Sequence, residues 1–74
     1  MTDAERLERA GRLLHGPNWQ TPLAADLDVT LRTVQRWAAG GGKGGIPAGV
    51  WAELRRLLLQ RSRDAAAYAE TLPG

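Results

Sequence analysis

The sequence predicts an all-α domain of four or five helices. Apolar residues recur every three or four positions in several stretches, which is the spacing of one helix face. Residues suited to capping a helix start precede these stretches, and glycine and proline follow the first of them. A length of 74 residues allows one domain, spanning 1–74, with one small core.

The first helix is predicted over residues 3–15. Thr2 and Glu5 have the spacing of a capping box, in which each side chain binds a free backbone amide. Gly16 and Pro17 then end the helix. Its apolar face consists of Leu7, Ala10 and Leu14.

Residues 20–37 predict two short helices joined by a tight turn at 27–29. We expect Thr21 to cap the first helix, with Pro22 at its first helical position, and Thr30 to cap the second. The apolar residues that hold the pair together are Leu23, Ala24, Leu27, Val29, Val34 and Trp37. Just before the pair, Trp19 is expected to be buried against the first helices, and stacking on a nucleic-acid base is the alternative.

At these residues the chain resembles the helix-turn-helix of lambda-repressor-like and Cro-like phage regulators. Gln20 opens the motif, and Ala24 is the small residue where the two helices approach each other. The family usually has glycine in the turn, where this chain has Asp28, which tolerates the left-handed conformation better than most residues. The resemblance covers 18 of the 74 residues and implies a lambda-repressor-like domain whose second helix enters the DNA major groove.

Residues 40–45, GGGKGG, predict a mobile loop because glycine disfavours both helix and strand. A nucleotide-binding P-loop is excluded, since no serine or threonine follows the lysine and no strand precedes it. Two interpretations stay open: Lys43 and the loop amides contact the DNA backbone, or the loop is only a spacer.

The last helix is predicted from near Pro47 to as far as Leu72, and it is longer than so small a core requires. Its apolar face is Val50, Trp51, Leu54, Leu57 and Leu58. Its far end is a candidate dimer contact, formed by Ala65, Tyr68, Ala69 and Leu72, and a frayed tail is the alternative.

The net charge of +2 is unevenly distributed. Residues 1–28 hold three basic and five acidic side chains, residues 29–63 hold seven basic and one acidic, and residues 64–74 hold two acidic. The basic block begins at the expected recognition helix and has no acid between Val29 and Ala52, as a phosphate-binding face requires. A solvated helix surface is the alternative for residues 55–63.

Several classes of function lack the residues that they need. The chain has no cysteine, one histidine, His15, which we expect to be a cap or surface residue, and one serine, Ser62. We therefore expect no enzyme, no metal site and no cofactor. No apolar run is long enough for a membrane and no signal-peptide pattern is present, so we expect a cytoplasmic protein. No ligand-sensing domain fits, so no small-molecule ligand is expected.

The expected function is sequence-specific binding of double-stranded DNA by a transcriptional regulator. The resemblance implies a small phage or prophage repressor. A single recognition helix contacts few base pairs, so we expect a homodimer on an inverted-repeat operator with half-sites ~34 Å apart. The expected base-reading residues are Leu31, Arg32, Gln35 and Arg36, and the expected DNA-backbone contacts are Gln20, Thr21, Thr30, Thr33 and Lys43.

Two other functions fit the same elements. The chain could keep the helix-turn-helix fold as a protein–protein interaction module, or act as a structural or regulatory subunit through its long C-terminal helix.

Overall fold

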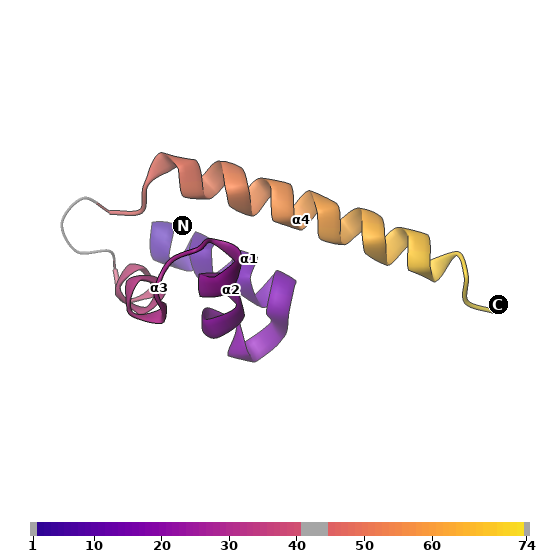
Figure 1. Ribbon diagram of the computed structural model, residues 1–74, viewed down its shortest axis with the longest axis horizontal. Helices are drawn as coiled ribbons and strands as arrows, with labels where there is room; N and C mark the ends of the chain where they lie inside the picture. The colour runs from indigo at the N-terminus through magenta and orange to yellow at the C-terminus, as the bar shows by residue number, and fades with distance from the viewer. Residues whose placement is uncertain (1, 41–44, 74) are drawn as a thin grey trace.

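The computed structural model describes residues 2–40 and 45–73. Within these ranges the chain forms α-helices, one short 3₁₀ helix and no strand, which confirms the all-α class. The elements are α1 (Asp3–His15), η1 (Gly16–Asn18), α2 (Gln20–Asp26), α3 (Leu31–Ala38) and α4 (Ala48–Ala69). Helices α1, α2 and α3 cluster together, and α4 lies across α1 and extends well past the cluster (Figure 1).

Helix α1 has the boundaries that the sequence predicts. The amide of Glu5 donates to the Thr2 hydroxyl at 3.1 Å, and the amide of Thr2 donates to the Glu5 carboxylate at 3.4 Å, which completes the capping box. At the other end Gly16 has a φ of 79°, a conformation that favours glycine and stops the helix.

The predicted start of α2 is wrong. The helix begins at Gln20, with Trp19 at the cap position and no side-chain cap, so Thr21 lies inside the first turn. The 3₁₀ turn η1 and Trp19, which already has helical torsion angles, lead the chain directly into α2. Pro22 is tolerated there because the first amides of a helix have no partner within it. The first backbone hydrogen bond of α2 runs from the Leu23 amide to the Trp19 carbonyl at 3.0 Å.

The turn between α2 and α3 is stabilised by its backbone. Asp28 has a φ of 55°, so it occupies the left-handed conformation. The phage regulators that the chain resembles usually have glycine at this position. The amide of Val29 donates to the Ala24 carbonyl at 3.0 Å, and that of Asp28 to the Ala25 carbonyl at 3.2 Å. This is the Schellman pattern of helix termination, and it sets the angle at which α3 leaves the turn.

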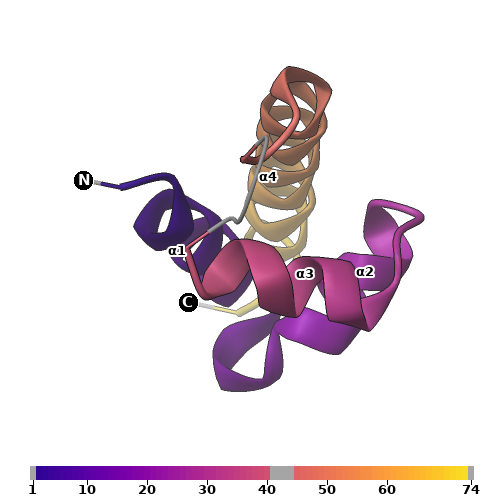
Figure 2. The ribbon, with the colours of Figure 1, turned by 90° about the vertical axis from the view of Figure 1, so that its left-hand side faces the viewer.

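Helix α3 begins with the predicted cap. The Thr30 hydroxyl accepts a hydrogen bond from the Thr33 amide at 3.1 Å. Figure 2 shows α3 lying across the molecule with α2 beside it. The cap and the preceding turn together fix which side of α3 faces the other helices.

The core gathers around α1, α2 and α3. Its largest fully buried side chains are Leu7, Leu23 and Val34. Trp19 is buried as predicted, and its ring packs on Gly11 of α1. The other buried residues of this core are Ala10, Leu14, Ala24, Trp37 and Leu54.

A side-chain contact joins the ends of α1 and α2. Nε2 of His15 lies 2.6 Å from a carboxylate oxygen of Asp26, eleven residues away. This contact, which the sequence analysis did not predict, ties two helix ends together at the surface.

Helix α4 contacts the core with its first half only. Leu54 is buried, and Val50, Trp51, Leu57 and Leu58 are partly buried against the core. Every residue over 59–73 is exposed. The helix ends at Ala69, short of the predicted limit at Leu72, because the Thr71 hydroxyl and amide both donate to the Tyr68 carbonyl in a closing turn. Helix α4 runs along the longest dimension of the molecule, which is 50 Å.

Among the described helices, none combines the length and the apolar character that a membrane crossing requires.

Candidate nucleic-acid interface

Helix α3 has one buried face. Val34 is fully buried and Trp37 is only 4% exposed, and both belong to the core. They are three residues apart, so they share the side of α3 that faces α1 and α2. The inward orientation predicted for these two residues is confirmed, and it determines which residues of α3 face outward.

The four predicted base-reading residues lie together on the outward face. Leu31 is 38% exposed, and Arg32, Gln35 and Arg36 are exposed as well. Steps of four residues separate Leu31 from Gln35 and Arg32 from Arg36, so these pairs are neighbours along the helix. The result is a polar ridge of two guanidinium groups and one amide around a leucine.

The two arginines of this ridge differ from the arginines that form ion pairs on α1 and α4. Neither Arg32 nor Arg36 forms an ion pair with any residue in the described ranges. Arg56 of α4, by contrast, donates two hydrogen bonds to Glu53. These bonds lower the pKa of Glu53 and raise that of Arg56. The free positive charge of α3 is therefore available for an anionic partner.

The described residues among the predicted backbone contacts lie at the starts of α2 and α3. Thr21 is exposed and Gln20 is half-buried at the start of α2. At the start of α3, the Thr30 and Thr33 hydroxyls lie 2.9 Å apart and bond to each other. Thr30 keeps its capping role whatever else it contacts. Lys43 lies outside the described residues.

A polar hollow adjoins the start of α2 and contains residues that the sequence analysis missed. It is lined by Arg12, Pro17, Asn18, Trp19, Gln20 and Thr21. Asn18 and Arg12 thereby join the two expected backbone-contact residues on one surface. The sequence signal for Asn18 was its place directly before a buried tryptophan and a helix start. Arg12 gave no such signal, because it belongs to α1.

Comparisons with protein-family models, with curated proteins and with solved structures gave no match to this chain. The candidate interface therefore stands on its geometry and charge.

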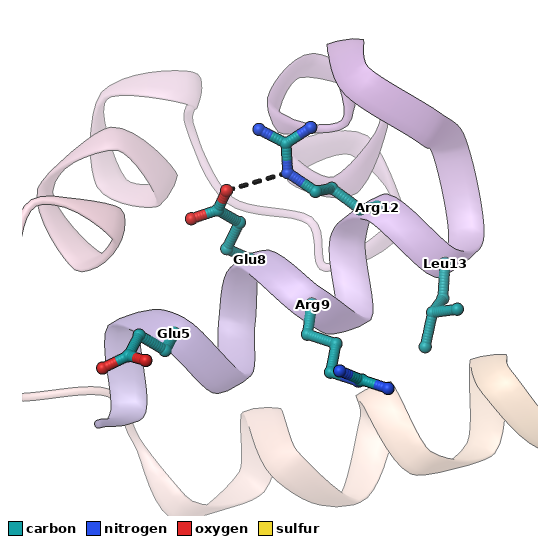
Figure 3. Close-up of a pocket in the computed structure, with 5 residues that line it drawn as sticks. All are labelled: Glu5, Glu8, Arg9, Arg12 and Leu13. Atoms are coloured by element: carbon teal, nitrogen blue, oxygen red, sulfur yellow. Dashed lines mark hydrogen bonds and ion pairs between the residues drawn. The ribbon is translucent and has the colours of Figure 1, made fainter. Parts of the chain in front are cut away.

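A second hollow lies on the outer side of α1 (Figure 3). All five of its lining residues come from that one helix: Glu5, Glu8, Arg9, Arg12 and Leu13. Nε of Arg12 lies 2.8 Å from the Glu8 carboxylate, and both side chains are about half exposed. Paired charges on a single solvated helix do not make a binding site.

The residues expected at a dimer contact have no cover from the described part of the chain. Tyr68 is 66% exposed and Leu72 is 53% exposed, and Ala65 and Ala69 are exposed beside them. Metal binding has no candidate site either, since residues 2–40 and 45–73 contain no cluster of three or more potential ligands.

Proposed function

We propose that this protein binds specific sequences of double-stranded DNA through α3 and regulates transcription, as a small repressor of the phage type. The observation that carries the proposal is the outward ridge of α3, where exposed Arg32, Gln35 and Arg36 surround Leu31. An α-helix fits the width of the major groove, and these side chains match the groups displayed there.

The chemistry of each side chain assigns it a base. Arg32 and Arg36 can each donate two parallel hydrogen bonds to O6 and N7 of guanine. The Gln35 amide can donate to N7 and accept from N6 of adenine, and Leu31 can pack on the methyl group of thymine. Leu31 is exposed on this face, and a thymine methyl would give it an apolar partner.

Electrostatics supports the same partner. The two α3 arginines carry charge that no described carboxylate neutralises. No acid occurs between Val29 and Ala52, so phosphates would meet no repulsion along this stretch. Thr21 and Gln20, next to the polar hollow at the start of α2, are suited to hold a phosphate and set the register of α3.

The proposal is tested by selecting bound fragments from random double-stranded DNA with the purified full-length chain. We expect a short enriched motif containing guanine, and an affinity for it ~10³-fold or more above that for scrambled DNA. Titrations at several salt concentrations separate the contribution of phosphate contacts from that of base contacts. Phosphate contacts depend on salt and apply to every sequence.

Recovery of no enriched motif, with equal weak binding to all sequences, would contradict the assignment. A helix-turn-helix module that serves protein–protein interaction would give that result.

A further inference from the structure

The face of α4 that packs on α1 follows a heptad pattern. Trp51, Leu54 and Leu58 are separated by three and then four residues, and they lie against the core. Alternation of three- and four-residue steps is the spacing of the contact positions in a coiled coil. These three residues also line an apolar groove between α1 and α4, together with Ala10, Leu59, Arg6 and Arg55.

The same pattern continues where α4 has left the core. The next steps of three and four residues reach Arg61, Ala65 and Tyr68, and all three are exposed. Figure 1 shows this half of α4 extending alone beyond α1, α2 and α3. The heptad pattern of contact positions therefore extends over twice the length of α4 that packs against the rest of the chain.

The charges of this extended half are segregated along the helix. Residues 55–63 carry four arginines and no acid, whereas residues 64–72 carry Asp64 and Glu70 and no base. Two such helices attract each other when they run in opposite directions, since each basic segment then meets an acidic one. In a parallel pair, each basic segment would instead lie beside the basic segment of the other copy.

We propose that two copies of this chain associate through an antiparallel pairing of their α4 helices. In the heptad register, Leu58 lies opposite Tyr68 of the other copy, and Arg61 lies opposite Ala65. Because the pair has two-fold symmetry, each of these contacts occurs twice. Tyr68 then sits at the open end of the apolar groove, where it also meets the half-exposed Leu59.

Arg61 explains the direction of the pairing. In a parallel pair the two Arg61 side chains would meet at the same level of the seam, which buries two like charges. In the antiparallel pair each Arg61 lies across a small alanine, so its guanidinium can pass over Ala65 to the neighbouring Asp64 of the other copy. The only charged residue of the exposed seam thus has an oppositely charged partner.

The contact requires no DNA, so it goes beyond the proposed function and is tested without it. Sedimentation equilibrium of the full-length protein at micromolar concentration should show a dimer. Ala65→Arg places a second positive charge opposite Arg61 of the other copy and should raise the dissociation constant by more than about 100-fold. The matched control is Ala67→Arg, which adds the same charge to an exposed alanine on the opposite side of α4 and should leave the constant unchanged. Circular dichroism checks that both variants stay helical.

Disulfide trapping tests whether the two α4 helices pair in the antiparallel direction. The chain has no native cysteine, so only the introduced cysteines can form a disulfide. A mixture of Leu58→Cys and Tyr68→Cys chains should form the mixed disulfide under mild oxidation, whereas either variant alone should not. Self-linking of Tyr68→Cys would instead show a parallel pair and overturn the register. A wild-type monomer, or equal dimerisation of the two arginine variants, would overturn the interface. Neither result would bear on DNA binding, which the selection experiment measures separately.

Discussion

The ring of Trp19 lies directly on the backbone of Gly11, and the contact leaves no room for a side chain at that position. A Cβ atom on Gly11 would fall within 3.0 Å of three atoms of the indole. Trp19 directly precedes α2, so this contact fixes the start of α2 against the middle of α1. The placement of α3 follows from it, because the turn after α2 sets the path of α3.

Replacing Gly11 by alanine should therefore destabilise the protein. We expect a loss of about 1–3 kcal/mol in the free energy of unfolding, since either the indole or α1 must shift. Gly49→Ala is the matched control, because a Cβ there meets no atom within 4 Å and alanine favours the helix. Urea titrations compare the two. Equal stability of both variants would show that the indole has room to move.

The ridge of α3 gives the second prediction. Arg32→Ala and Arg36→Ala should each weaken binding to the selected DNA site by roughly 1–3 kcal/mol and relax the sequence preference at one position. Lys43→Ala should weaken binding to all sequences alike and lower the salt dependence if the glycine-rich loop contacts phosphate. Fluorescence titrations with specific and scrambled DNA separate these effects. Wild-type affinity in both arginine variants would remove them from the interface.

Trp37 gives the third prediction, on stability. Its ring is 4% exposed at the meeting of three helices, so Trp37→Ala should cost ~3–5 kcal/mol, much of the stability of a small domain. Gln35→Ala changes the exposed side of the same helix and should stay within about 0.5 kcal/mol of wild type. Thermal melts followed by circular dichroism measure both. A Trp37 variant that melts with the wild type would mean that α3 is rotated.

Asp28 gives the fourth prediction. Its φ of 55° is a conformation that glycine adopts without strain and alanine does not. Asp28→Gly should keep or slightly raise the stability, whereas Asp28→Ala should lower it by about 1 kcal/mol. Chemical denaturation of the three proteins gives the order. If alanine is as stable as glycine, the turn has a different conformation from the one described.

The fifth prediction connects α4 with DNA. Truncation after Arg63 removes the part of α4 that makes no contact with the core, and the described residues 64–73 are all exposed. Helices α1, α2 and α3 should therefore stay folded while the affinity for the operator falls steeply. Footprinting with the full-length chain should show two related half-sites ~34 Å apart or at a multiple of that spacing. Protection of one asymmetric half-site by a monomer at full affinity would contradict the dimer on DNA.

Local signals in the sequence predicted the helices well and one of their starts badly. Thr2, Glu5 and Thr30 cap as predicted because a cap depends only on residues within one turn. The predicted cap at Thr21 was wrong because a helix can also begin directly after a 3₁₀ turn. Here that turn leaves Trp19 already in a helical conformation. That helix start is decided by the burial of Trp19 on α1, which no local pattern contains.

The outward side of α3 was predictable for the same reason that its inward side was. Val34 and Trp37 are apolar residues three positions apart on one face of an eight-residue helix, so the core takes that face and solvent receives Arg32 and Arg36. Arg12 and Asn18 were not predictable as neighbours of Thr21, since the hollow that joins them forms only when α1 meets α2. The pairing of His15 with Asp26 depends on the same packing.

The sequence by itself determined the helical class, the left-handed turn at Asp28 and the exposed chemistry of α3. These follow from torsional preferences and from the separation of apolar from polar residues over one or two helical turns. Only the tertiary structure decided that Trp19 closes on Gly11 and that α4 buries one half of its apolar face. Both depend on which distant segments compete for the same core, and a core of this size covers α4 only as far as Leu58.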